Sequence, residues 1–325
     1  MRAAVCTAYG GPEVVQLTDI PMPEPSDDQL LVRVTSSTVN RTCSEIRSAT
    51  PQLAIRLAYG IRRPRRPVLG TDFAGSVERI GPGVRGFTVG DRVFGFDDRL
   101  MGAHGEYLTI SAAAAVAKIP DDVSDDSAAA AVEGAHYSLA SIDLAALERG
   151  NRALVYGGGG AIGSTAIQLL VSRGVDVTAV AEAHQLDLMR NLGASAAIDF
   201  RAEDFTAIGE TFDFVFDAVG KTTFAACRKL VTPGGVFIST ELGPRLQNLR
   251  LSLTTRFRGD VRVRFPFPLH ARQHVKTARE ELGAGTLRPV IDRCVDLDDI
   301  VEAYRYVETA TKTGSVVLRV ADAVD

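Results

Sequence analysis

A run of glycines near the middle of the chain follows a short apolar segment and precedes an amphipathic one. In VYGGGGAIGSTAIQLL, Gly158, Gly160 and Gly163 have the spacing G-x-G-x-x-G. Between a predicted strand and a predicted helix, this spacing is typical of a dinucleotide-binding turn. We expect Gly158 to permit the tight turn, Gly160 to let the backbone approach a pyrophosphate and Gly163 to let the helix pack on the strand. Ala161 and Ile162 then contribute N–H groups at the start of that helix.

An acidic residue follows the next predicted strand. VDVTAV ends beside Glu182, about 20 residues beyond the glycines, where a carboxylate would hold the ribose diol of a dinucleotide. A carboxylate there repels a 2′-phosphate and favours NADH, whereas His184 and Arg190 favour NADPH. A glycine turn that binds nothing and a surface role for Glu182 are the alternatives. The sequence therefore predicts NADPH or NADH and leaves the choice open.

The region beyond Ser127 alternates predicted strands with helices, which predicts an α/β fold with a doubly wound parallel sheet of the Rossmann type. The strands are RALVY, VDVTAV, ASAAID, FDFVFDAV and GGVFIST. Two of them end in Asp217-Ala-Val-Gly220 and Ser239-Thr240, at the edge of such a sheet where ligands bind. Val219 and Thr240 are therefore candidate contacts on the nicotinamide side. Asp217 has the alternative role of capping the next helix.

The first 120 residues predict a different architecture. They contain short strands separated by Pro- and Gly-rich turns, which indicates a β-rich domain with a boundary near residues 120–127. Near the carboxyl terminus we expect a polar helix around His270–Leu282, a second around Asp298–Val307 and a last strand, SVVLRV. These elements are candidates to complete the β-rich domain.

Composition favours a globular protein with a small-molecule ligand. Apolar residues make up 46% of the chain, charged residues 23%, and the net charge is −4. Mixed charges argue against nucleic acid or a membrane as partner, and the start of the chain lacks a signal-peptide pattern, so we expect a cytoplasmic protein. The four cysteines are too scattered for a structural zinc site or a disulfide scaffold. The arginine-rich IRRPRRP, residues 61–67, is expected to be an exposed loop at the rim of an active site.

Several segments along nearly the whole chain resemble one protein family. They are MRAAVCTAYGGPEVVQL, SSTVNRTCSEIRS, RRPVLGTDFAGSVERIGPGV, VGDRVFGF, GAHGEYLTI, GGGGAIG, FDAVG, VTPGG and LRPVIDR. Together they resemble the zinc-free quinone oxidoreductase branch of the medium-chain dehydrogenase/reductase superfamily. The resemblance implies a GroES-like catalytic domain of residues 1–122 and 266–325, with a Rossmann domain of residues 123–265 inserted into it. It also implies a homodimer.

The resemblance carries expectations for individual residues. Asn40 matches the position of a Cys zinc ligand in zinc-dependent relatives, and Thr71 the position of a His ligand, so we expect no metal. In the family the amide at Asn40 contacts the cofactor ribose or the substrate oxygen; a turn-forming role is the alternative. Tyr137 stands where the family has Thr, and its phenol is a candidate proton donor, with core packing as the alternative. Cys43 replaces an acidic residue of the family.

The resemblance also implies contacts to the 2′-phosphate of NADPH. The family holds it with a small hydroxyl residue, a Lys and a Tyr, and the matching positions here are Glu182, Gln185 and Phe200. All three depart from the family pattern. The departure weakens the preference for NADPH that the resemblance implies.

These observations predict an enzyme that works without a metal. Hydrogen-bond donors must then polarise the substrate carbonyl, and water or a side chain must protonate the enolate that hydride addition forms. Such chemistry suits quinones and α,β-unsaturated carbonyls better than simple alcohols. We therefore expect an NAD(P)H-dependent reductase of these compounds that acts by direct hydride transfer. An alcohol or enoyl dehydrogenase on a specific biosynthetic intermediate and a non-catalytic cofactor-sensing protein are the alternatives.

Overall fold

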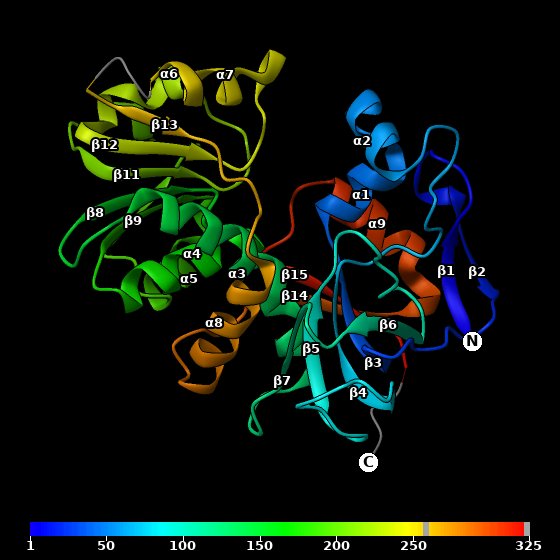
Figure 1. The fold of residues 1–325 in the computed structure, drawn as a ribbon. Coiled ribbons are helices and arrows are strands. Elements are labelled where there is room, and N and C mark those ends of the chain that lie inside the picture. The colour runs from blue at the N-terminus through cyan, green and yellow to red at the C-terminus, as the bar shows by residue number, and fades with distance from the viewer. Residues whose placement is uncertain (256–259, 322–325) are drawn as a thin grey trace. The chain divides into compact units, whose positions relative to one another are not determined.

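The computed structural model of the protein describes residues 1–255 and 260–321 (Figure 1). Contacts divide the chain into two compact units. The first contains residues 1–133, 271–284 and 291–325, and the second contains residues 134–270 and 285–290. The first crossing between them falls inside one long helix, α3 (Asp125–Ala145), just beyond the boundary expected near residues 120–127.

The first unit is built on a seven-stranded, mainly antiparallel sheet. Its strands follow the order β14-β15-β3-β4-β5-β7, and β6 also pairs with β3. A separate antiparallel ribbon is formed by β1 and β2. The bounds are β1 (Arg2–Cys6), β2 (Val15–Asp19), β3 (Gln29–Val39), β4 (Asp72–Ile80), β5 (Arg92–Phe96), β6 (Tyr107–Ser111), β7 (Ala115–Lys118), β14 (Ile291–Asp296) and β15 (Ser315–Arg319).

Four further helices belong to the first unit: α1 (Arg41–Ser48), α2 (Gln52–Tyr59), α8 (Ala271–Gly283) and α9 (Ile300–Glu308). The apolar residues of α9 recur at helical spacing and are buried in the core of this unit, together with β3, β4 and α1. The expected carboxyl-terminal helices and strand correspond to α8, α9 and β15. Sequence reasoning did not predict α2, whose short apolar segment lies between a Pro and a Gly.

The second unit contains a six-stranded parallel sheet in the order β10-β9-β8-β11-β12-β13. The chain order reverses between β8 and β11, which is the switch point where open α/β sheets bind ligands. The predicted doubly wound parallel sheet is confirmed. The bounds are β8 (Arg152–Tyr156), β9 (Asp176–Ala181), β10 (Ala196–Asp199), β11 (Phe212–Asp217), β12 (Val231–Ser239) and β13 (Arg262–Arg264).

Helices cover both faces of this sheet. In Figure 1, α4 (Ala161–Ser172) and α5 (Leu186–Asn191) lie on one side, and α6 (Phe224–Cys227) and α7 (Gln247–Thr254) on the other. The β-branched and aromatic residues of the central strands are almost fully buried, as two covered faces require. Among the helices of residues 1–255 and 260–321, none combines the length and the apolar character needed to cross a membrane.

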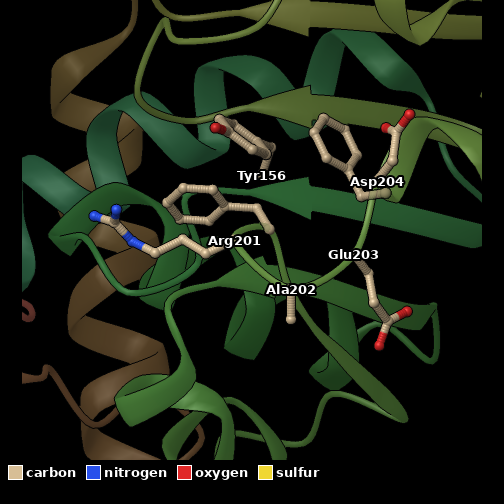
Figure 2. Close-up of a pocket in the computed structure, with 7 residues that line it drawn as sticks. Tyr156, Arg201, Ala202, Glu203 and Asp204 are labelled. Atoms are coloured by element: carbon tan, nitrogen blue, oxygen red, sulfur yellow. The ribbon is translucent and has the colours of Figure 1, made fainter.

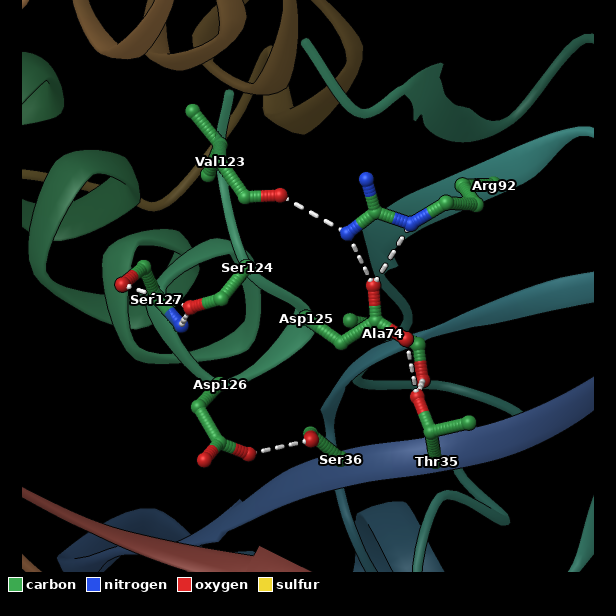
Figure 3. A network of polar contacts seen from close by, with 9 residues as sticks. All are labelled: Thr35, Ser36, Ala74, Arg92, Val123, Ser124, Asp125, Asp126 and Ser127. Carbon is green, nitrogen blue, oxygen red and sulfur yellow. Dashed lines mark hydrogen bonds and ion pairs between the residues drawn. The ribbon is translucent and has the colours of Figure 1, made fainter. Parts of the chain in front are cut away.

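Polar contacts hold the start of α3 against the sheet of the first unit (Figure 3). Asp125 accepts hydrogen bonds from Thr35 and from Arg92, which also forms an ion pair with it. Asp126 accepts a hydrogen bond from the hydroxyl of Ser36, with 2.6 Å between the oxygens. Two acidic residues in the first turn also suit the positive end of the helix dipole. The beginning of α3 is therefore fixed to β3 and β5.

Candidate functional site

The glycine loop connects β8 to α4 at the carboxyl edge of the parallel sheet. Gly157 has the left-handed backbone conformation of the turn, with φ of +82°. Sequence reasoning expected Gly158 to permit the tight turn, but the structure places the positive φ one residue earlier. The N–H groups of Gly157 and Gly158 both donate to the carbonyl of Val180, and Gly160 donates to Gly157. These bonds tie the loop to the end of β9.

At two other positions of the loop, Gly158 and Gly163, neighbouring atoms leave no room for a Cβ. An added Cβ at Gly163 would overlap the carbonyl oxygen of Gly157, so this position requires glycine for the helix to approach the loop. At Gly158 an added Cβ would lie 2.7 Å from the sulfur of Met189. Gly160 differs, because the nearest atom to an added Cβ is 3.6 Å away. The fold alone therefore leaves room for a side chain at Gly160.

The start of α4 is the part of the loop that fits a phosphate. Gly160 caps the helix with an extended backbone and no side-chain hydrogen bond. The N–H groups of Ala161, Ile162 and Gly163 belong to the first turn, where an α-helix has no carbonyl partners for them. Such groups, together with the helix dipole, form an anion site. The loop therefore fits the pyrophosphate of a dinucleotide, and these residues would hold it.

Other predicted residues share the edge with the glycine loop. The last residues of β8, β11 and β12, which are Tyr156, Asp217 and Ser239, are direct partners in the parallel pairing. Val219 packs against the loop, because a Cβ at Gly157 would lie 2.6 Å from its methyl groups. Thr240 follows Ser239 and donates its backbone N–H to the carbonyl of Asp217. The sheet therefore brings Val219 and Thr240 to the edge predicted for them.

Asp217 organises the turn after β11. Its buried carboxylate accepts the backbone N–H groups of Val219, Lys221 and Thr222 and the hydroxyl of Ser239. Burial raises the pKa of Asp217, and these hydrogen bonds oppose the rise. The expected alternative, that Asp217 caps the next helix, is wrong, because the N-cap of α6 is Thr223. Asp217 instead shapes the loop that carries Val219.

The end of this edge at β9 and β10 contains charged residues. Glu182 directly follows β9 and is the cap of a short turn, in which it and Gln185 form reciprocal hydrogen bonds. Arg201 donates to the Glu182 carboxylate at 2.7 Å, and Nδ1 of His184 lies 3.7 Å from it. Arg190 pairs instead with Asp187 at 2.8 Å. Sequence reasoning missed Arg201, because the residue lies in the loop after a different strand.

The predicted catalytic Asn40 lies in the first unit and is 2% exposed. Its side-chain oxygen accepts the N–H of Cys43 at 2.8 Å and so caps α1. Its amide nitrogen donates to the hydroxyls of Thr38 and Thr71, at 3.3 and 3.2 Å. Both amide protons of Asn40 therefore have protein acceptors. The turn-forming role and a positioning role both agree with these contacts.

Asp72 extends the network around Asn40. Its carboxyl oxygens accept the hydroxyl of Thr38 at 2.7 and 2.9 Å, and one of them accepts the backbone N–H of Thr38 at 3.2 Å. Burial, reinforced by the charge of Glu133, raises the pKa of Asp72 to about 8, although its bonds to Thr38 oppose this. Sequence reasoning assigned Asp72 no role. An acidic residue at the start of the apolar strand DFAGSV was the available signal.

The side chains near Asn40 do not fit a zinc ion. Asn40 and Thr71 bond to each other, and neither provides the thiolate, imidazole or carboxylate that zinc takes. Burial, with the charges of Asp72 and Glu133, raises the pKa of Cys43 to about 12, so this thiol is protonated and unreactive. In the part of the chain that the structure describes, no three His, Cys, Asp or Glu side chains gather as a metal site.

Tyr137 lies on α3 within the second unit and is half-buried. Its ring packs edge-on against His136, with 5.3 Å between ring centroids. The neighbouring Ser138 donates to the carbonyl of Ile162, which joins α3 to the first turn of α4 at 2.9 Å. Tyr137 is therefore carried by a helix that is fixed to the glycine-loop helix.

Comparisons with known proteins agree with this architecture. Residues 26–121 match the family model described as alcohol dehydrogenase GroES-like domain, and residues 192–318 match the model described as zinc-binding dehydrogenase. The solved structure of a quinone oxidoreductase from Coxiella burnetii superposes with a TM-score of 0.87 at 24% identity, covering 99% of each chain. These matches confirm the predicted fold class of a Rossmann sheet with a β-rich GroES-like domain.

Two relatives of known activity align along nearly the whole chain. An NADPH-dependent alkenal/one oxidoreductase of Arabidopsis thaliana is 28% identical over 98% of this chain and 79% of its own. A quinone oxidoreductase of Homo sapiens is 27% identical over 98% of this chain and 97% of its own. Both are oxidoreductases, so the resemblance extends beyond the separate domains.

Proposed function

Because this chain belongs to the quinone oxidoreductase-like branch of the medium-chain dehydrogenase/reductase superfamily, we propose that it reduces quinones or α,β-unsaturated carbonyls with NADPH or NADH. The observation that carries the proposal is the glycine loop. Gly157 adopts the positive φ that the turn requires, and Gly163 lets α4 pack closely against the loop. The first turn of α4, which has no side-chain cap, suits a pyrophosphate. When bound there, the reduced nicotinamide supplies a hydride.

The residues of the second unit hold the cofactor in this proposal. The first turn of α4 binds the pyrophosphate through the N–H groups of Ala161, Ile162 and Gly163. Glu182 lies at the ribose end of the edge, and Val219 and Thr240 follow the two strands on the other side of β8. This division of roles follows from the strand order, since ligands cross the carboxyl edge at the switch point.

In the proposed reaction the substrate oxygen is polarised by hydrogen-bond donors and not by a metal. Support comes from the residues around Asn40, whose donor set does not fit zinc. We assign Asn40 a positioning role, because its amide holds Thr71 and caps α1 at the same time. Tyr137 is the proposed donor of the proton that completes reduction of an enone, with water as the alternative donor.

Turnover with a substrate panel tests the proposal. The purified protein is mixed with NADPH or NADH and with enones or quinones, and separately with NADP⁺ or NAD⁺ and primary alcohols, and cofactor absorbance is followed. We expect oxidation of the cofactor with enones or quinones and little activity with alcohols. Cofactor binding without any turnover would contradict the proposal and favour a cofactor-sensing protein. Activity confined to alcohols would favour the dehydrogenase alternative.

We also propose a homodimer that joins the second units. β13 is the last strand of the parallel sheet and pairs only with β12 among the described strands, so no other described strand covers its outer edge. Phe267 and Leu269, just beyond it, are 57% and 60% exposed. A second copy would cover both features. Sedimentation equilibrium showing a monomer at micromolar concentration would contradict this assembly.

A further inference from the structure

An ion pair at the ribose end of the edge joins two neighbouring strands. Ala181, the last residue of β9, is paired in register with Asp199, the last residue of β10. Glu182 and Arg201 follow these two residues, and the Arg201 guanidinium donates to the Glu182 carboxylate at 2.7 Å. The parallel register therefore brings together two charges that lie 19 residues apart in the chain.

The electrostatics of this pair bear on the cofactor's ribose. A lone carboxylate at the end of this strand binds the ribose diol of NADH and repels the 2′-phosphate of NADPH. Here the Glu182 carboxylate is already paired with the Arg201 guanidinium. The hydrogen bond and charge of Glu182 raise the pKa of Arg201. An arginine near this position is also what accommodates a 2′-phosphate. Glu182 and Arg201 thus have opposite effects on the same phosphate.

The surroundings of Arg201 leave its guanidinium available to a ligand. Its side chain is 67% exposed. Within the described residues, Glu182 is the side chain that accepts a hydrogen bond from it. A guanidinium carries five N–H groups, so donors remain for a phosphate. The guanidinium also lies over the ring of Phe200, 5.4 Å from its centroid, which restrains it without using those donors.

Arg201 borders a cavity of about 370 Å³ (Figure 2). In Figure 2, Tyr156 stands at the end of its strand, and the side chains of Arg201 and Glu203 point in different directions. The rings of Tyr156 and Phe205 are stacked 4.9 Å apart and form one part of the wall, which also contains the acidic Glu203 and Asp204. The lining residues are Tyr156, Phe200, Arg201, Ala202, Glu203, Asp204 and Phe205.

We propose that Arg201 is a specificity-determining residue that lets this chain accept NADPH, by neutralising Glu182 and binding the 2′-phosphate. The inference rests on the proposed function, because it concerns the cofactor of that same site. NADH binds through Glu182 in the same protein, so both cofactors are used.

Direct binding measurements with NADPH and NADH test the proposal. Calorimetric titrations compare the unchanged protein with Arg201→Gln and Glu182→Gln. Loss of one favourable charge contact is expected to weaken NADPH binding about tenfold in Arg201→Gln and to leave NADH binding within about twofold. Glu182→Gln is expected to shift the ratio towards NADPH. Arg228→Gln removes an exposed arginine that precedes β12, at the opposite edge of the sheet, and serves as the charge control, with no change in the ratio.

The outcomes separate the two claims. Equal weakening of both cofactors by Arg201→Gln, or no weakening of either, would overturn the role of Arg201 and leave the proposed function standing. The same change of ratio in Arg228→Gln would also overturn it, because the effect would then be long-range. Failure of the unchanged protein to bind either cofactor would overturn the proposed function, and this inference with it.

Discussion

Gly163 lies against the carbonyl oxygen of Gly157, so closely that an added β-carbon would overlap this oxygen. The contact joins the first turn of α4 to the turn that ends β8. It sets how near the helix N-terminus comes to the edge of the sheet. The proposed pyrophosphate site therefore depends on a steric relationship between two glycines that lie six positions apart.

We expect Gly163→Ala to disturb both the fold and cofactor binding. The methyl group forces the helix away from Gly157, which should lower the free energy of unfolding by about 1–3 kcal/mol. Gly160→Ala is the matched control, because the nearest atom to its added Cβ is 3.6 Å away. It should change stability by under about 1 kcal/mol yet weaken dinucleotide binding. Chemical denaturation and calorimetric titration measure the two effects, and unchanged binding in both variants would contradict the assignment.

Asn40 should contribute to both stability and turnover. Asn40→Ala removes the cap of α1 and leaves Thr38 and Thr71 without their amide donor, a loss of about 2 kcal/mol in the free energy of unfolding. Asn40→Ser retains a capping oxygen and should recover about half of this loss. Denaturation midpoints and kcat are measured on both. If the amide donors matter for positioning, kcat stays low in Asn40→Ser, and recovery of kcat along with stability would contradict this role.

Asp72 should make the protein less stable as the pH rises. Its pKa of about 8 in the folded protein lies above the ordinary value near 4 of an unfolded chain. Between about pH 4 and pH 8 the folded protein therefore binds more protons, so the free energy of unfolding decreases across this window. The stabilisation is complete below about pH 4 and lost above about pH 8.

Denaturation of Asp72→Asn across the same window isolates the effect. The variant has no carboxyl group to titrate, so its free energy of unfolding should fall less steeply with pH than that of the unchanged protein. Asp122→Asn changes an exposed carboxyl of the same unit and should give a curve parallel to the unchanged protein. Parallel curves for Asp72→Asn as well would show that Asp72 is ionised in the folded protein.

Tyr137→Phe tests the proposed proton donor. The substitution keeps the ring that packs against His136, so stability should change by under about 1 kcal/mol, while kcat with enones should fall by about 100-fold. Cofactor affinity should not change. Tyr306→Phe, a half-buried tyrosine of α9 in the other unit, is the control. A kcat equal to that of the unchanged protein would show that water supplies the proton.

Local patterns in the sequence predicted the parallel sheet and the glycine loop. A G-x-G-x-x-G run between a strand and a helix, with β-branched strands around it, has few physical realisations, because parallel strands buried on both faces need helical crossovers. Even there the position of the turn was one residue off. Gly157 and Gly158 are chemically identical, and the sign of φ depends on how the loop bonds to Val180.

The pairings at the site were decided by tertiary structure. Arg201 reaches Glu182 because β9 and β10 are in register, and Asp72 reaches Thr38 because β3 and β4 are antiparallel neighbours. Both contacts join residues far apart in the chain, and neither has a local signature. The sequence determines which residues are charged. Strand order and register determine which partner neutralises each charge.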